Sequence, residues 1–375
     1  MKLTITQAQL AYGLGMVSRA VSPRSTLPVL NNILLATDEG RLRLSATNLE
    51  LGITCWINAD IEEEGSVTIP ARIFSDLVNT LPGDKVSLSL TIRTQTLNIH
   101  CGASNFDIKG IDAQEFPPMP LPDLSSGVEL NVTDFKDMIH QVSFAASSDE
   151  ARPVLQGVLL EINDNEISLA ATDGFRISVR TAELSASQAN PVKVIIPARS
   201  LSELARIATD GKETITMVVP PDRGQAIFHM KNVELVTQLI EGVFPEYRAI
   251  IPRSFKTRTV ISTQEFLKAC RQAEIIAREG NYVIRLNLQP QEGAPGAVEF
   301  STQSEEMGSG EVIVDANIEG PELLIAFNVS FLSEVLEVIG TPNTILETNA
   351  NNTPGLLTPV GNDSFRHVIM PMHID

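Results

Sequence analysis

The sequence predicts an α+β protein made of three tandem copies of one unit, with two helices packed on antiparallel sheets in each copy. The first observation is a repeated helical segment. IPARIFSDL at 69–77 returns as IPARSLSEL at 196–204, 127 residues later, and as the diverged FNVSFLSEV at 327–335, a further 131 residues on. The second is a repeated strand block, opened by LPVL at 27–30 and by RPVL at 152–155, 125 residues later. Such long periods indicate whole domains rather than solenoid units.

The repeats also end alike, which gives the domain boundaries. Phe116-Pro-Pro closes the first copy and Phe244-Pro-Glu the second, while the third ends at the C-terminus of the chain. A linker rich in proline and serine covers 117–127. We therefore expect domains at 1–121, 128–250 and 251–375.

The first unit shows the expected elements in order. A helix at 7–20 follows Thr6, a suitable N-cap. Strands follow at 41–46, 66–69 and 86–92, where apolar and polar residues alternate. Segments typical of turns or loops separate the strands in this unit and in the second. They are Asp38–Gly40, Glu62–Glu64, Pro82–Asp84 and Asn163–Asn165.

A second helix follows Pro70, because proline is favoured in a first helical turn. Its predicted apolar stripe is Ile73, Leu77 and Val78. The later units repeat this pair of helices at 134–147, 198–209, 264–278 and 329–339. In the first helix, Gly13 and Gly15 are interpreted as small residues at a close contact, not as a dinucleotide-binding loop.

Charge is distributed unevenly along the chain. The 28 Lys and Arg against 46 Asp and Glu give a net charge of −18, which argues against a protein that covers phosphate with its whole surface. The six helical segments hold eight basic and nine acidic residues, so nearly all of the excess acid lies elsewhere. A helical face that accepts a polyanion and an ordinary solvated face both fit this balance.

Cysteines and apolar runs indicate the compartment. Cys55, Cys101 and Cys270 form no spaced pair, which is typical of a reducing cytoplasm and of buried small hydrophobic residues. The N-terminus shows no signal peptide and no apolar run reaches the length of a membrane span. We expect a cytoplasmic protein that does not engage membranes.

The sequence shows no catalytic constellation. None of the five histidines is spaced from another His or Cys as zinc ligands are, and His100 and Cys101 point to opposite faces of a strand. Gly308-Ser-Gly310 is not a nucleophile elbow, and no Walker loop is present. We therefore expect a non-catalytic protein with no cofactor and no metal site.

Several motifs, taken together and in order, closely resemble the bacterial DNA polymerase III beta subunit, the sliding clamp. They are Ser22-Pro-Arg24, Thr26–Leu30, the two IPAR helices, Ala171-Thr-Asp-Gly-Phe-Arg176, Phe244–Arg248 and Met370-Pro-Met372. The resemblance implies three DNA-clamp domains per chain and a head-to-tail homodimer that closes a ring around double-stranded DNA. It further implies a processivity factor that tethers the replicative polymerase, the clamp loader, and repair and translesion polymerases through short peptides.

The resemblance also assigns DNA-contacting loops. Arg24 matches a loop arginine of the first domain, and Arg152 matches one in the second. At the glutamine-like position of that second loop this chain has Asp149. The remaining DNA-binding candidates are basic residues of the predicted helices: Arg72, Lys136, Arg199, Lys268 and Arg271.

A partner-peptide cleft is implied between the second and third domains. The matching positions are Leu155, Thr172, Gly174, Phe175, Arg176, Ile177, Pro245, Ile250, Asn328, Phe331, Val368, Ile369, Met370, Pro371 and Met372. Met370 and Met372 offer adaptable apolar contacts, and Arg176 offers a guanidinium for carbonyls or carboxylates. Phe175 stands where some relatives have histidine, and the chain ends with an additional acidic residue, Asp375.

The implied dimer interface joins the first domain of one chain to the third domain of the other. Phe106, Ile275 and Ile276 match its apolar positions. Ion pairs from Glu305, Glu306 or Glu311 to Lys109 are also expected. The alternative function is a non-catalytic scaffold that gathers proteins through the same cleft without encircling DNA.

Overall fold

The computed structural model describes residues 1–22, 27–120, 123–209, 213–221, 223–279 and 281–373. It divides into two compact units. One comprises Met1–Thr133 and Glu203–Leu239, and the other comprises Asp134–Ser202 and Ile240–Asp375. The predicted second domain, 128–250, therefore contributes to both units. The domain boundaries expected from the repeats stay a prediction.

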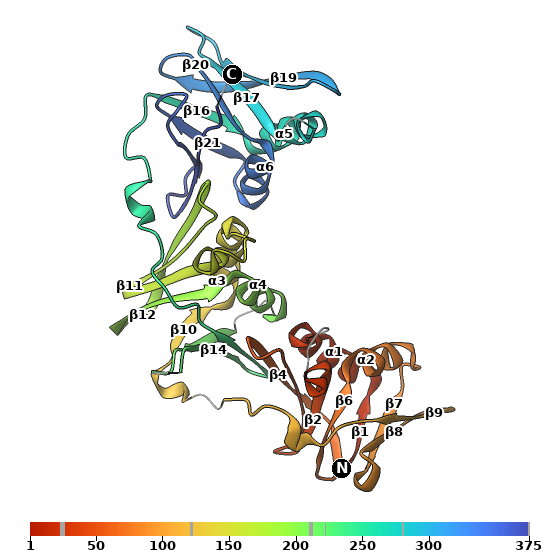
Figure 1. Ribbon diagram of the computed structural model, residues 1–375. Coiled ribbons are helices and arrows are strands. Elements are labelled where there is room, and N and C mark those ends of the chain that lie inside the picture. The colour runs from red at the N-terminus through yellow and green to blue at the C-terminus, as the bar shows by residue number, and fades with distance from the viewer. Residues whose placement is uncertain (23–26, 121–122, 210–212, 222, 280, 374–375) are drawn as a thin grey trace. The chain divides into compact units, whose positions relative to one another are not determined.

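The first unit holds two antiparallel sheets and two helices, α1 (Gln7–Val17) and α2 (Ala71–Thr80), which lie side by side (Figure 1). The smaller sheet runs in the order β5 (Asp60–Glu63), β1 (Lys2–Thr6), β7 (Lys85–Thr91), β8 (Thr96–Cys101) and β9 (Ser104–Lys109). The larger runs β10 (Val128–Asn131), β13 (Thr214–Val218), β14 (Gln225–Met230), β15 (Val233–Gln238), β4 (Leu51–Asn58), β3 (Arg41–Thr47), β2 (Asn32–Asp38) and β6 (Ser66–Pro70).

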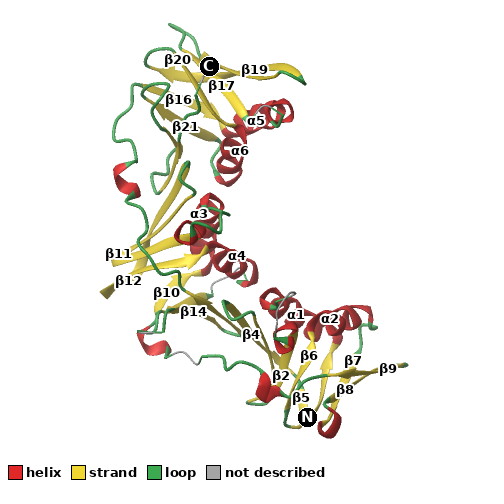
Figure 2. Ribbon diagram, viewed as in Figure 1, coloured by secondary structure: helices red, strands yellow, loops and turns green. Residues whose placement is uncertain are grey.

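The second unit holds one antiparallel sheet, the helices α5 (Thr263–Ala277) and α6 (Val329–Val338), and α3 (Val132–Val142) from Asp134 onwards, while α4 (Ala198–Ile207) is divided between the units (Figure 2). The sheet runs β11 (Gly157–Thr172), β12 (Arg176–Pro197), β23 (Phe365–Ile369), β22 (Gly355–Pro359), β21 (Asn343–Thr348), β16 (Thr257–Ser262), β19 (Gly308–Glu319), β18 (Gly296–Ser304), β17 (Val283–Gln289) and β20 (Leu323–Asn328).

Both large sheets join strands of different sequence repeats. In the first unit β15, from the second repeat, pairs with β4, from the first, through Val233↔Cys55 to Thr237↔Leu51. In the second unit β23, from the third repeat, pairs with β12, from the second. Backbone hydrogen bonds therefore connect neighbouring repeats, in addition to the linkers.

The helices confirm the predicted positions and two of the predicted local contacts. The hydroxyl of Thr6 accepts a hydrogen bond from the Gln9 amide and caps α1. A Cβ at Gly13 would lie 2.8 Å from Cδ1 of Leu44, so a small residue is required there, whereas Gly15 has open space around it. Cys55, Cys101 and Cys270 are all buried free thiols.

The predicted apolar stripe of the second helix is wrong at one position. Ile73 is 60% exposed, and the buried face of α2 consists of Ala71, Phe74 and Val78. Pro70 serves as the N-cap rather than a residue of the first turn. Phe74 has more apolar area than Ile73, so the rotation that buries it gains more from the hydrophobic effect.

Two predicted loops are also wrong. Glu62 and Glu63 lie in β5, where the Glu62 carboxylate is 2.6 Å from Nζ of Lys2 on the adjacent β1. Asn163–Asn165 lies inside the continuous strand β11, where the register with β12 shifts around Asp164. Asp164 has φ of 54°, so the turn-forming residues make a bulge instead of ending the strand.

Candidate functional site

The loop between β11 and β12 is built by its own side chains. The Thr172 hydroxyl donates to the Arg176 carbonyl at 2.7 Å and accepts from the Gly174 amide. Oδ1 of Asp173 accepts from the amides of Phe175 and Arg176. Gly174 has φ of +97°, a conformation that a side chain would strain. The loop thereby presents the Phe175 ring, which is 61% exposed.

The guanidinium of Arg176 is enclosed rather than free. Its Nε donates to Asp173 at 3.1 Å, and Nη2 donates to the Phe144 carbonyl. Nη1 lies 2.6 Å from the carboxylate of Glu334 on α6. The Arg176 side chain is only 7% exposed, and these three partners surround its nitrogens. That this group reads carbonyls or carboxylates of a ligand stays a prediction.

Two aromatic rings lie close to the same guanidinium. The Arg176 carbon Cζ lies 4.2 Å from the Phe331 ring centroid and 5.3 Å from that of Phe144. Phe144 in turn stacks on the imidazole of His367, with centroids 5.6 Å apart. Arg176 therefore joins the loop after β11 to Phe331 on α6, and Phe144 continues this row of side chains to His367.

His367, at the end of this row of side chains, is fully buried. Its Nδ1 shares a hydrogen bond with the Ser178 hydroxyl at 2.7 Å. Burial and the nearby positive charge of Arg176 lower the pKa of His367 from 6.5 to about 3. The imidazole is therefore neutral near pH 7.

The C-terminal strand lies beside the loop. Ile369 of β23 pairs with Arg176, and Val368 pairs with Ile177. Beyond the strand, the Met370 amide donates to the Phe175 carbonyl at 2.9 Å and the Met372 amide donates to the Ala326 carbonyl. These bonds hold Met370, which is 41% exposed, next to Phe175.

The other predicted cleft residues lie in the same compact unit. Asn328 caps α6 by accepting from the amides of Ser330 and Phe331. The Leu155 amide donates to the Arg152 carbonyl. Pro245 is exposed beside the buried Phe244, and Ile250 is 44% exposed. Pro371 is half-buried, whereas Asp375 lies outside the described residues.

Of the two predicted DNA-binding loops, one can be described. Arg24 lies outside the described residues. Nε of Arg152 donates to Asp149 at 2.9 Å, and Nη1 donates to the Asp173 carbonyl. The Ala151 amide and Arg152 lower the pKa of Asp149. The acidic residue at the glutamine-like position therefore neutralises the neighbouring arginine.

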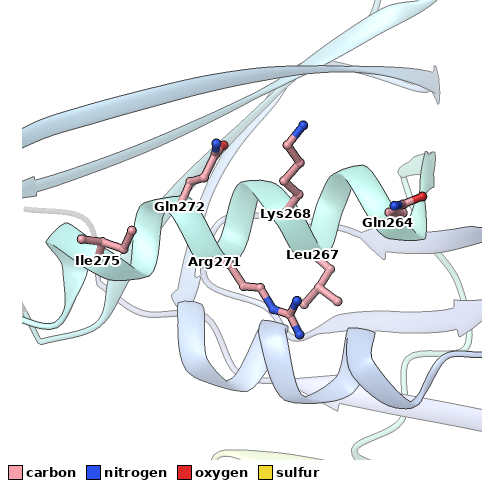
Figure 3. Close-up of a pocket in the computed structure, with 6 residues that line it drawn as sticks. All are labelled: Gln264, Leu267, Lys268, Arg271, Gln272 and Ile275. Carbon is pink, nitrogen blue, oxygen red and sulfur yellow. The ribbon is translucent and has the colours of Figure 1, made fainter.

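Most of the predicted basic helix residues also have acidic neighbours. Arg72 lies 3.8 Å from Asp76, and Lys268 lies 3.9 Å from Glu265. Figure 3 shows Arg271 and Leu267 directed towards the neighbouring helix and Lys268 directed away from it; Arg271 reaches Glu337 on α6 at 2.9 Å.

Two basic residues complete this set. Arg199 is exposed in the first turn of α4 and has no acidic partner among the residues that the structure describes, while Lys136 on α3 is half-buried. The side chains that would meet phosphate are therefore mostly exposed. Their acidic partners are exposed as well, and dissolved salt weakens the attraction within such pairs.

The predicted dimer residues are exposed in the single chain. Phe106 is 44% exposed on β9, an edge strand. Ile275 is 70% exposed on α5, and Ile276 is half-buried against Gly310. Glu305, Glu306 and Glu311 line an open cavity of about 910 Å³ in the second unit. Lys109 belongs to the first unit, and its ion pairs with these glutamates stay a prediction.

Sequence reasoning missed the residues that support the cleft. Asp173 stands inside the quoted motif, but nothing in the sequence pattern indicates that Phe144 and Glu334 meet Arg176. It also assigned no function to the loop at Thr47–Leu51, although Ala46-Thr47-Asn48 corresponds to Ala171-Thr172-Asp173 in the repeat. That repetition is the signal that could have identified it.

Within the described ranges, His, Cys, Asp and Glu form no cluster of three that could hold a metal ion. No helix of the described chain combines the length and apolar character of a membrane span.

Comparison with known proteins gives the family. Three sequence models, described as the N-terminal, central and C-terminal domains of the DNA polymerase III beta subunit, match residues 1–120, 129–246 and 248–373. The beta sliding clamp of Synechococcus elongatus is 33% identical over 378 residues, which is all of both chains.

Solved structures agree over the whole length. The DNA polymerase sliding clamp of Bacillus subtilis superposes with a TM-score of 0.94 at 29% identity, covering 100% of both chains. A DNA polymerase III beta subunit of Pseudomonas aeruginosa bound to griselimycin gives 0.92 at 28% identity and the same coverage. The chain therefore belongs to the DNA polymerase III beta subunit family and is a sliding clamp, the non-catalytic processivity factor of the replicase.

Proposed function

We propose that two copies of this chain close head to tail into a ring that encircles duplex DNA and slides along it without sequence preference. The match of three successive clamp domains over the whole chain carries this proposal. The domains are those of the repeats, 1–121, 128–250 and 251–375. The ring acts in the cytoplasm, where the three free thiols stay reduced.

Free strand edges support the assembly. In the described part of the smaller sheet, β9 pairs only with β8, so its other edge is open. The strand β19 pairs with β16 only over Ala316–Glu319, which leaves 308–315 open on that side. Antiparallel addition of β9 to this segment would bury the exposed Phe106 and Ile313 and bring Lys109 towards Glu311.

Contacts to DNA are expected to be with phosphates, from Arg24, Arg152, Arg199 and the other basic helix residues. Such contacts position DNA and carry no sequence information, so they permit sliding. Weak contacts suffice because retention is topological. The acidic excess elsewhere on the chain disfavours DNA on other surfaces.

The cleft around Phe175 and Met370 would take short peptides of the polymerase, the clamp loader and repair polymerases. Exposed aromatic and thioether groups adapt to several ligands. Arg176 forms a wall of this cleft, held in place by Asp173, the Phe144 carbonyl and Glu334. A tethered polymerase then stays near its template at high effective concentration.

Loading on circular DNA tests the topological part. Clamps loaded on a nicked circle should remain bound through gel filtration and leave when a restriction enzyme cuts the circle. Retention on DNA with a protein block at both ends provides the control. Loss that does not depend on cutting would favour the scaffold that does not encircle DNA.

A further inference from the structure

The first repeat contains a second copy of the cleft loop. The Thr47 hydroxyl donates to the Leu51 carbonyl at 3.0 Å and accepts from the Leu49 amide. Oδ1 of Asn48 accepts from the amides of Glu50 and Leu51. Thr172 and Asp173 make the same bonds in the predicted cleft.

The neighbouring strand repeats as well. The Gln238 amide donates to the Glu50 carbonyl at 2.8 Å, as the Met370 amide donates to the Phe175 carbonyl. Val236 pairs with Gly52, as Val368 pairs with Ile177. Loop, strand and connecting bond thus form the same arrangement in the first unit.

A cavity of about 180 Å³ opens at this loop. Its lining consists of Thr47, Leu49, Glu50, Gly52, Pro117, Pro118, Met119, Pro120, Gln225, Val236 and Gln238. Seven of these lining residues correspond in the repeat, in the same order along the chain, to residues of the predicted cleft. Those cleft residues are Thr172, Gly174, Phe175, Ile177, Pro245, Val368 and Met370. The loop of the first repeat therefore borders a cavity in addition to sharing the backbone pattern.

The backbone at this cavity is strained. Leu49 has φ of 77°, in the left-handed region, and its side chain is 51% exposed. The corresponding Gly174 adopts its positive φ without such strain. Strain of this kind at an exposed loop is typical of binding sites.

The lining indicates the ligand. Leu49, Met119 and Val236 give apolar walls, and Gly52 leaves room where the other cleft has Ile177. Met119 fills part of that room, since a Cβ at Gly52 would lie 2.5 Å from its methyl group. Glu50 makes no ion pair with any residue that the structure describes, and it replaces Phe175.

We propose that this cavity is a second peptide site, which binds a short extended segment of a partner protein through one aliphatic side chain and a neighbouring lysine or arginine. The apolar walls receive the aliphatic group, and the Glu50 carboxylate pairs with the basic one. The amides of Gln225 and Gln238 can bond the peptide backbone. This second peptide site rests on the proposed function, because it is inferred by analogy with the predicted peptide cleft at Phe175 and Met370.

Photolabelling of the full chain tests it. The probe is acetyl-leucine-photoleucine-lysine amide, irradiated with the protein and mapped by peptide mass spectrometry. We expect labels at 47–52, 117–120 or 225–238. The variant Glu50→Lys should lower these labels at least fivefold, and so should replacement of the probe's lysine by glutamate. Glu129→Lys, which changes an exposed carboxylate on β10, is the matched control and should leave them within twofold.

The two sites give separate results. No label at the second site, or labels there that Glu50→Lys leaves unchanged, would overturn the second site. Labels at 172–177 and 368–372 report on the predicted cleft independently, so their absence would count against the proposed function instead. Circular dichroism of Glu50→Lys verifies that the variant is folded.

Discussion

The guanidinium carbon Cζ of Arg176 lies over the ring of Phe331, 4.2 Å from its centroid, although the two residues are 155 positions apart in the chain. The contact joins β12 to α6, and the ion pair with Glu334 reinforces it. An arginine in this position acts as a structural connection between the second and third repeats. Its removal should therefore affect both stability and peptide binding.

The first prediction is that Arg176→Ala lowers the free energy of unfolding by about 3–5 kcal/mol, because it removes one partner of a largely buried ion pair. Arg176→Lys should recover less than half of the lost free energy of unfolding. An ammonium group, unlike the planar guanidinium, cannot stack on aromatic rings and donate several hydrogen bonds in one plane. Urea unfolding measures both. Arg72→Ala, at an arginine that is 95% exposed, should cost less than about 0.5 kcal/mol. Equal stability of Arg176→Ala and the original chain would contradict the structural role.

The second prediction concerns the C-terminus. Deletion of 370–375 should abolish binding of partner peptides to the predicted cleft, because Met370 and Met372 supply its apolar contacts. The strand β23 ends at Ile369 and remains intact. Fluorescence anisotropy with a labelled polymerase peptide measures binding, and sedimentation verifies the dimer. Unchanged affinity would mean that the cleft has been assigned to the wrong residues.

The third prediction concerns assembly. Ile275→Ala should weaken the dimer at least tenfold, since about 1.5–3 kcal/mol is gained when such a side chain becomes fully buried. The fold should not suffer, because Ile275 is 70% exposed in the single chain. The double variant with Ile276→Ala should weaken it further. Ile73→Ala changes an isoleucine of similar exposure on α2 and is the control. Sedimentation profiles at decreasing concentration distinguish these outcomes.

The fourth prediction concerns pH. The folded chain keeps His367 neutral down to about pH 3, whereas the unfolded chain protonates it below 6.5. The free energy of unfolding should therefore fall as the pH drops below 6.5, by up to about 1.4 kcal/mol per pH unit from this group. In His367→Gln this contribution should disappear, while His140→Gln, at an exposed histidine, should keep it. Urea unfolding at pH 7.5, 6.0 and 5.0 measures the slopes, and identical slopes would refute the buried neutral imidazole.

The fifth prediction concerns DNA. Asp149→Gln should free Arg152 for a phosphate, raise the affinity for duplex DNA two- to fivefold at low salt and steepen the salt dependence by about one unit. Glu150→Gln makes the same change of net charge at the adjacent exposed residue and should have a smaller effect. Binding measured between 50 and 200 mM salt compares them. A larger effect of Glu150→Gln would contradict the role of the Asp149–Arg152 pair.

Local signals in the sequence predicted the local structure well. Thr6 and the IPAR segments located helices, because capping and apolar periodicity act within a few residues. The assignment failed where two local signals competed. Asn163–Asn165 has turn chemistry, yet the long ladder between β11 and β12 continues through it as a bulge. At α2, Phe74 replaced Ile73 on the buried face because the core selects the larger side chain.

Tertiary relationships were less accessible from the sequence. The pairing of β15 with β4 joins residues far apart in the chain, and no periodicity encodes such a partner. The enclosure of Arg176 depends on Phe144 and Glu334, which come from two other segments. A single sequence identifies the arginine but not its surroundings, so it could not show that the guanidinium is already engaged.

The ladders between neighbouring repeats have a mechanical consequence. Wherever β15 meets β4, or β23 meets β12, a pulling force along the chain would load five residue pairs together rather than the single covalent linker. Pulling parallel to the strands strains all of these pairs at once, so such joints resist rupture far better than contacts between side chains alone. A protein that opens the proposed ring would therefore separate the seam between two chains, which no covalent linker spans, and leave these internal joints closed.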